Sequence, residues 1–219
     1  MNNYRINYIF LVLITLAFSS AFSYSNTGGF KIGANVSSLP GGEEGDQSSI
    51  RGINCGIFYN YQFCRFFSIQ PEIYFTSKGK EDIILSLGAH NNQPTVIYYV
   101  EMPILAKFTF LDHGSLKYNV FGGPYVSRFI TGVTSIPYDQ ITGEEEELKL
   151  RGKVQDYDYG LTFGLQLDIM VIDFRRWMVS VDIRRTIGLK NIDTELTYPW
   201  LKDRRNSTNS AMVSLGYRF

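Results

Sequence analysis

Hydrophobic and polar residues alternate with a period of two over most of this chain. In residues 67–76, one set of alternate positions is Phe, Ile, Pro, Ile and Phe, whereas the other is Ser, Gln, Glu, Tyr and Thr. Residues 160–169 repeat the pattern, with Leu, Phe, Leu, Leu and Ile interleaved with Gly, Thr, Gly, Gln and Asp. Because successive side chains of a β-strand point to opposite faces, this alternation predicts strands with one apolar and one polar face.

The same alternation identifies eight strand candidates. They lie near residues 29–38, 52–63, 67–78, 97–110, 117–129, 157–169, 177–189 and 209–219. Each is long enough to cross a membrane as a tilted strand, which takes about 9–11 residues. No run of residues after position 23 reaches the roughly 18 consecutive apolar residues that indicate a membrane-spanning helix.

The connections between these candidates alternate in length. Three are short turns, at residues 64–66, 111–116 and 170–176. Four are long polar loops, at residues 39–51, 79–96, 130–156 and 190–208. Short turns at one end and long loops at the other are typical of outer-membrane barrels, in which the turns face the periplasm. An even number of strands also places both ends of the domain on the periplasmic side.

The residue types at the alternating positions indicate which face is inside. Gly, Ser, Thr, Asn and Gln predominate at the polar positions, where a surface exposed to water would carry mostly Lys and Glu. Small uncharged residues suit the crowded lumen of an eight-stranded barrel. The apolar positions carry aromatic residues near the strand ends, which suits rings at the level of the lipid headgroups.

We therefore predict an all-β fold, namely an eight-stranded antiparallel up-and-down transmembrane β-barrel. The alternative is a soluble barrel of the lipocalin kind, in which the apolar face would point inward. Pro71, Pro103 and Pro124 fall inside strand candidates. Because proline cannot donate to the hydrogen-bond ladder, each is expected to mark a bulge or another local distortion.

A signal peptide is predicted for residues 1–23. An apolar run at residues 8–18 follows a short stretch whose one charge is Arg5, and small residues come after it. Cleavage after Ala21 and cleavage after Ser23 both fit this pattern, and both remain open. The apolar run is shorter than the about 20 residues of a membrane-spanning helix. We therefore expect residues 24–219 to form an exported barrel domain in the outer membrane.

The composition excludes several other classes of protein. Lys plus Arg and Asp plus Glu number 21 each, so there is no basic surplus of the kind that nucleic-acid binding requires. A hydrophobic content of 44% argues against a disordered chain. Two cysteines are too few for a disulfide-built mini-domain. Cys55 and Cys64 would lie roughly 30 Å apart on an extended strand, so both are expected to be unpaired.

Six charged residues fall at positions of the inward, polar face: Glu72, Glu101, Lys107, Asp168, Asp182 and Arg184. We interpret them as a structural network of paired charges that fills the lumen, since unpaired buried charges are costly and eight-stranded barrels are packed. The alternative is a charged pore or a proton relay.

Neither histidine indicates a metal site or a cofactor. Neither His90 nor His113 has the neighbouring pattern of several His, Cys or carboxylate residues that a metal ion needs. His90 has Asp82 and Ser86 nearby in a predicted outer loop, which is the basis of a barrel-enzyme alternative. The acidic runs at 41–46 and 143–148 are interpreted as solvated loops, with binding of divalent cations or basic partners as the alternative.

Four segments resemble a known family. FFSIQPEIYFTSKG (66–79), YYVEMPILAKF (98–108), YNVFGGPYVSRF (118–129) and IRRTIGLKNI (183–192) are similar to the PorT-like outer-membrane β-barrel family of Bacteroidetes-type bacteria. The terminal SLGYRF, which includes Tyr217 and Phe219, resembles the last-strand signal that the barrel-assembly machinery reads. The resemblance implies an eight-stranded barrel in a Gram-negative outer membrane, and the name of the family implies an accessory role in a secretion or gliding complex.

The expected function is therefore that of a non-enzymatic outer-membrane barrel with a structural or binding role. Its expected partners are outer-membrane lipid, the barrel-assembly machinery during biogenesis and a protein that contacts the long extracellular loops, with no nucleic acid and no cofactor. The alternatives are a small transporter or porin-like barrel and a soluble lipocalin-like binder.

Overall fold

The computed structural model describes the chain in seven stretches, which are residues 25–38, 49–86, 89–137, 145–149, 155–171, 176–190 and 205–219. Within them, only the backbone is described for residues 80–86, 89–95, 133–137 and 145–149. The predicted signal peptide and the acidic run at 41–46 lie outside the described residues.

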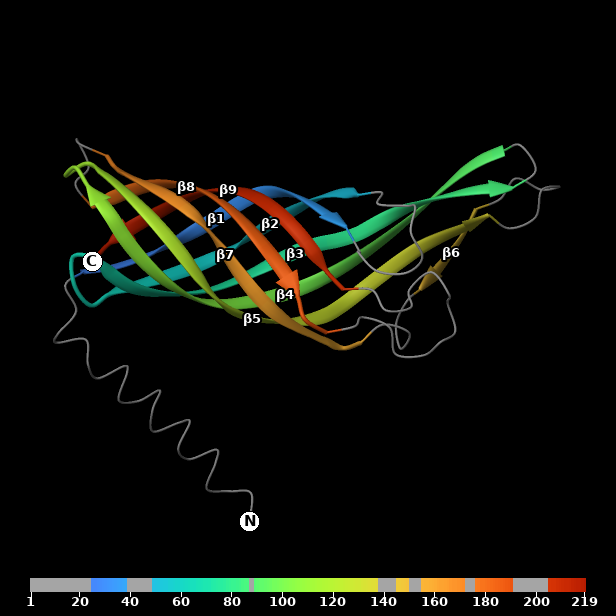
Figure 1. The fold of residues 1–219 in the computed structure, drawn as a ribbon, viewed down its shortest axis with the longest axis horizontal. Coiled ribbons are helices and arrows are strands. Elements are labelled where there is room, and N and C mark those ends of the chain that lie inside the picture. Colours follow the sequence, from blue (N-terminus) through green and yellow to red (C-terminus); the bar gives the residue numbers. More distant parts are fainter. Residues whose placement is uncertain are drawn as a thin grey trace, which may run out of the picture.

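The described residues form nine strands. These are β1 (Ser25–Ser38), β2 (Ile50–Gln62), β3 (Phe67–Ser86), β4 (Ala89–Asp112), β5 (Leu116–Pro137), β6 (Glu145–Lys149), β7 (Tyr157–Met170), β8 (Trp177–Gly188) and β9 (Ser207–Arg218). Every neighbouring pair is antiparallel, and pairing of β1 with β9 and of β4 with β5 closes the sheet. The wall is thus an eight-stranded barrel, as predicted, while β6 pairs only with the far end of β5 (Figure 1).

Two of the predicted long loops contain additional strand. β3 and β4 continue their pairing from Lys78–Ile97 out to Ser86–Ala89, and β5 runs on to Pro137 beside β6. The prediction of loops at 79–96 and 130–156 was wrong in these parts. Beyond a membrane both faces of a hairpin can be polar, so the alternation is lost, yet the backbone groups still need hydrogen-bond partners. Figure 1 shows β3, β4 and β5 projecting past the other wall strands at one end.

The apolar face of the wall points outward. Phe30, Ile32 and Ile53 are 73%, 66% and 61% exposed, whereas the polar and charged side chains of the same strands, such as Lys31, Asn35 and Asn54, are buried at the alternate positions. This confirms the predicted orientation of the two faces and is the reverse of a soluble barrel. No helix in the described stretches is long and apolar enough to cross a membrane.

The three strand prolines interrupt the ladder without shifting it. Two residue pairs are missing beside each of Pro71, Pro103 and Pro124, and the register is the same on either side of each gap. The expected local distortion at each proline is thus a gap in the hydrogen bonding rather than a bulge, because proline has no N–H to donate. The register shifts of the wall lie elsewhere, between Tyr98 and Tyr99 and between Thr109 and Leu111.

The short turns lie at the end of the barrel opposite the projecting strands. There the backbone N–H of Phe219 donates to the carbonyl of Asn26 at 2.9 Å, so the start of β1 and the end of β9 both lie at the turn end. In the β4–β5 turn, Gly114 adopts a φ of 72° and its N–H donates to Asp112 at 3.1 Å. Cys55, on the outward face of β2, and Cys64, in the β2–β3 turn, are free thiols, as expected.

Candidate functional site: the polar lumen

Four charged side chains from three strands meet in the middle of the lumen. Lys31 of β1 places its Nζ 2.7 Å from Glu72 Oε1 of β3 and 2.9 Å from Asp182 Oδ2 of β8. Arg184 of β8 places Nη1 2.6 Å from Glu72 Oε2 and Nε 2.8 Å from Asp182 Oδ1. Two cations therefore balance two carboxylates, and none of the four side chains is more than 2% exposed.

Packing around this central cluster holds the guanidinium of Arg184 in place. The ring centroid of Phe121 lies 5.1 Å from the guanidinium carbon, within the range of a cation–π contact. A Cβ at Gly164 would lie 2.7 Å from that ring and 2.2 Å from the carbonyl oxygen of Ile183. The missing side chain at position 164 therefore leaves the room that the Phe121 ring occupies. In addition, Gln70 donates to Glu72 Oε1 at 2.7 Å.

A second cluster lies nearer the projecting strands. Lys78 forms an ion pair with Glu101, and the hydroxyl of Tyr74 donates to the same carboxylate. Lys78 also lies 5.0 Å from the ring centroid of Tyr125, whose hydroxyl donates to Asp158 Oδ2 at 3.0 Å. Asn206 donates to the same oxygen at 2.7 Å. The end of the lumen nearer the projecting strands is thus filled by tyrosines and by hydrogen-bonded carboxylates.

A third cluster closes the lumen at the turn end. Lys107 Nζ lies 2.8 Å from Asp168 Oδ2, which also accepts a hydrogen bond from Asn119 at 3.0 Å. Gln166 donates to the other carboxylate oxygen at 2.6 Å. The cavity beside this cluster has a volume of about 30 Å³, which is room for only a few water molecules.

All six of the predicted lumen residues face inward and are buried: Glu72, Glu101, Lys107, Asp168, Asp182 and Arg184. The structure brings three of them together in the central cluster and pairs Lys107 with Asp168. Glu101 pairs instead with Lys78, which was not among the predicted residues; nor was Lys31. Both lysines occupy the same alternate positions as polar lumen residues of their own strands, so counting by two would have found them.

In these clusters, buried cations and carboxylates neutralise one another's charge. A buried ion pair is stable only when its geometry is good and its remaining donors and acceptors are satisfied. The Glu72 and Asp168 carboxylates accept hydrogen bonds from amides as well as from cations, which meets this condition. Among the described side chains, no group of three or more His, Cys, Asp or Glu residues could hold a metal ion. The side chain of His90 lies outside the described residues, and its backbone belongs to β4 rather than to a loop.

The predicted assembly residues lie together at the turn end. The Tyr217 ring packs edge-on against Trp177 at 5.3 Å and against Phe219 at 5.5 Å between centroids. Arg176 donates to the Tyr217 hydroxyl at 3.0 Å, and Phe219 is 72% exposed. This aromatic group suits a membrane interface, with rings in lipid and polar tips toward water.

A closed eight-stranded wall with an apolar outer face and a packed polar lumen defines a bacterial outer-membrane β-barrel. Residues 4–194 match the family model described as the outer membrane protein beta-barrel domain, and the chain belongs to this family. None of the curated proteins is similar enough in sequence to count as a match.

Solved outer-membrane barrels share the fold. The outer membrane protein OprG from Pseudomonas aeruginosa is 13% identical with a TM-score of 0.53, and the match covers 90% of this chain and 97% of OprG. A major outer membrane protein from Thermus thermophilus is 11% identical with a TM-score of 0.48, over 88% of this chain and 99% of its own. Ail of Yersinia pestis is 15% identical with a TM-score of 0.44, over 89% and 99%. The likeness to OprG supports the barrel architecture and carries no information on function.

Proposed function

We propose that this protein is a non-enzymatic outer-membrane barrel with a sealed lumen that serves as a scaffold for binding outside the cell. The observation that carries the proposal is the set of three charge clusters at three levels of the lumen. Their ion-paired side chains are at most 5% exposed. A lumen filled in this way leaves neither a water-filled channel nor an open catalytic cleft.

The orientation follows from the two ends of the barrel. The short turns and both ends of the wall lie together, which is the periplasmic arrangement of an exported barrel. Residues 1–23 act as the signal peptide that delivers the chain, and the barrel-assembly machinery inserts it through the last strand, which ends at Tyr217 and Phe219. The PorT-like resemblance of the wall strands supports a Gram-negative envelope.

The binding role falls to the opposite end. There β3, β4 and β5 extend beyond the other wall strands, and β6 lies beside β5 with three glutamates in its sequence (Figure 1). Strands that continue past the membrane hold the adjoining loops on a rigid support, as suits contact with a partner protein. An accessory place in a secretion or gliding complex is the form of this role that the PorT-like resemblance suggests.

Heat-modifiability and conductance test the proposal together. The mature protein in washed outer membranes should stay folded in unboiled SDS and change its migration on boiling. The purified barrel in a planar bilayer should show no conductance above background. A soluble periplasmic protein without a shift would contradict the barrel, whereas stable step currents would favour the porin-like alternative over a sealed scaffold.

A further inference from the structure

Two arginines interrupt the apolar outer surface of β7, β8, β9, β1 and β2, which are consecutive in the wall. Arg185 of β8 and Arg51 of β2 both lie on the exposed, outward face. Within the bounds of these strands, every other charged residue, such as Lys31 or Asp182, is on the inward face. Outward charges on a barrel wall are unfavourable in the hydrocarbon layer, so the position of these arginines needs a physical reason.

The two arginines lie on one line of register partners, which crosses the strands at right angles and so runs obliquely to the barrel axis. The register pairs Arg185 with Asn209, Asn209 with Val36, and Val36 with Arg51 across four neighbouring strands. A parallel line joins Trp177, Tyr217, Gly28 and Tyr59, eight residues away along each strand.

The spacing of these two lines covers most of the apolar band of a membrane. Eight residues of strand span about 26 Å, or about 20 Å along the barrel axis at a tilt near 40°. The apolar band of an outer-membrane barrel is about 25 Å tall. The aromatic line lies at the turn end, so the arginine line lies in the outer part of the hydrocarbon, near its extracellular boundary.

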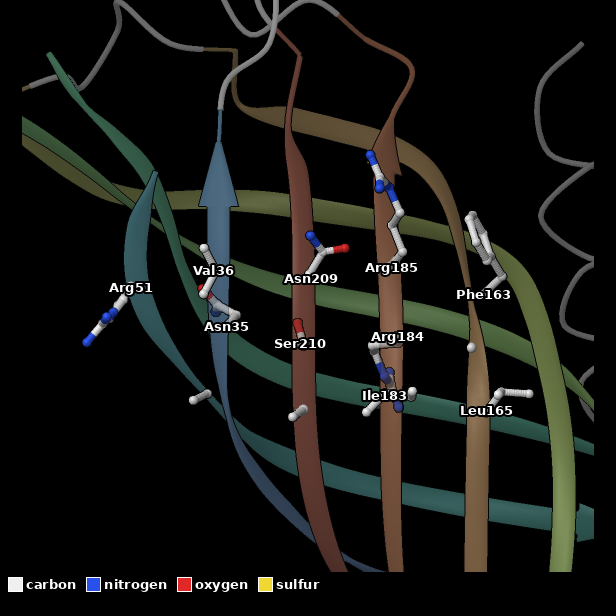
Figure 2. Close-up of a pocket in the computed structure, with 13 residues that line it drawn as sticks. Asn35, Val36, Arg51, Phe163, Leu165, Ile183, Arg184, Arg185, Asn209 and Ser210 are labelled. Carbon is white, nitrogen blue, oxygen red and sulfur yellow. The ribbon is translucent and has the colours of Figure 1, made fainter. Parts of the chain in front are cut away.

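An apolar groove runs along the wall just inside the arginine line. Ala34 and Ala211 are direct partners on adjacent strands and leave a depression beside the larger Ile183 and Leu165. The groove has a volume of about 620 Å³ and also reaches Val36. Figure 2 shows Arg185 and Asn209 above Ile183 and Leu165, with Arg51 on the far side of β1 and directed away from it. The arginines thus flank the outer end of the apolar groove.

Neither arginine has an acidic partner in the described part of the chain. The neighbouring Arg184 shows the contrast, because it is buried and bonds to both Glu72 and Asp182. Arg128, which is also on the outward face, lies over the Tyr157 ring at 6.0 Å. A guanidinium matches a phosphate with paired hydrogen bonds, and an acyl chain fills an apolar groove.

We propose that Arg51, Arg185 and Asn209 bind the phosphorylated headgroup of an outer-leaflet glycolipid, with an acyl chain of that lipid in the groove over Ala34 and Ala211. The site is separate from the partner-binding end of the barrel, and it rests only on the membrane orientation given above. The outer position of the arginine line is what selects an outer-leaflet lipid over a phospholipid of the inner leaflet.

The test uses the mature barrel, purified from outer membranes in a neutral detergent and titrated with lipid A. Native mass spectrometry measures the fraction of barrels that carry lipid. Replacing both arginines, Arg51→Gln with Arg185→Gln, should weaken lipid A binding roughly tenfold or more, as expected for lost charge-assisted hydrogen bonds. The matched control is Arg65→Gln with Arg176→Gln, which removes the same charge from exposed residues at the turn end and should leave binding unchanged.

Three further binding experiments identify the ligand. Dephosphorylated lipid A should bind at least tenfold more weakly than lipid A. Inorganic phosphate should not compete at concentrations similar to those of the lipid. Ala211→Leu, which fills the groove and keeps both arginines, should also weaken lipid A binding, since the acyl chain loses its place.

The outcomes that overturn the inference are specific. Equal lipid A binding by the wild type and the arginine variant would exclude the headgroup site. An equal loss in the turn-end control would mean general charge attraction. Equal binding of dephosphorylated lipid would leave only the apolar surface, and strong competition by inorganic phosphate would mean a site for the free ion. Each protein is first checked for its heat-dependent shift; a wild type without the shift would overturn the membrane barrel and this inference with it.

Discussion

Arg184 and Glu72 form an ion pair across the barrel, with Nη1 and Oε2 2.6 Å apart, although they are 112 positions apart in the chain. Arg184 belongs to β8 and Glu72 to β3, and three strands of the wall lie between β8 and β3 in either direction, so the two strands are opposite each other. The pair therefore braces the lumen from side to side, and Lys31 of an intervening strand joins it by bonding to Glu72 and Asp182.

Loss of Arg184 should destabilise the barrel strongly. Arg184→Met leaves Glu72 and Asp182 with Lys31 as their one cation in the central cluster, and breaking a buried pair in this way costs about 3–5 kcal/mol. Urea unfolding of the barrel in detergent micelles, followed by heat-modifiability, measures the loss. The neighbouring Arg185→Met, on the outward face, is the control and should change the free energy of unfolding by about 0.5 kcal/mol or less.

A second substitution separates charge balance from packing. Adding Glu72→Gln to Arg184→Met restores one cation to one carboxylate, namely Lys31 with Asp182. The double variant should therefore be more stable than the sum of the single losses predicts, which a double-mutant cycle shows directly. Additive losses would mean that the cluster acts by shape rather than by charge.

The alternation of the sequence was enough to predict the wall but not the pairs inside it. Lipid on one side and a narrow lumen on the other force each strand into two distinct faces, so residues such as Phe30 and Glu72 can be assigned by counting. Which inward residues meet depends on the stagger between strands, and no local pattern records it. Lys31 meets Glu72 and Asp182 from strands whose residues are 41 and 151 positions away.

The outer extensions were missed for a different reason. Residues 79–96 lie where neither face is forced to be apolar, so the period-two signal fades although the backbone still pairs from Lys78–Ile97 to Ser86–Ala89. The same holds for β6, which consists of a run of glutamates with Leu148 and Lys149. Charged residues are common on edge strands, where they prevent further pairing.

The two cysteines should report the orientation of the barrel. Cys64 is exposed in a turn at the predicted periplasmic end, and Cys55 faces lipid from β2. A membrane-impermeant maleimide should leave intact cells unlabelled and should label Cys64 once the outer membrane is opened. The single variants Cys55→Ala and Cys64→Ala assign the label, which only Cys64→Ala should abolish. Labelling of Cys64 on intact cells would invert the topology.

The turn end should lose a small part of its stability in acid. Burial alone would raise the pKa of Asp112, but the Gly114 N–H and the Arg65 guanidinium at 3.3 Å outweigh it and hold the pKa below its usual value. A carboxylate whose pKa is lowered by folding stabilises the protein above its unfolded pKa, and this contribution is lost as the pH falls through the folded pKa.

The variant Asp112→Asn should therefore differ from the wild type at neutral pH and converge with it as the pH falls through the lowered pKa of Asp112. Because Arg65 is well exposed, the difference at neutral pH should be about 0.5–1 kcal/mol. Unfolding in urea at a series of pH values measures it. Arg65→Gln, which keeps the Gly114 contact, should lose only part of the same difference; a gap that persists unchanged at low pH would mean that the carboxylate charge is not responsible.

The final residue should matter for assembly more than for stability. Phe219 is 72% exposed, so its ring adds little buried surface to the finished barrel beyond its contact with Tyr217. If the terminal aromatic is read by the assembly machinery, Phe219→Ser should lower the amount of heat-modifiable protein in the outer membrane severalfold. The same variant should refold into lipid vesicles as well as the wild type does. Phe110→Ser removes another exposed ring near the turn end and is the control, expected to assemble normally. Equal losses in cells and in vesicles would instead give Phe219 a purely structural role at the membrane boundary.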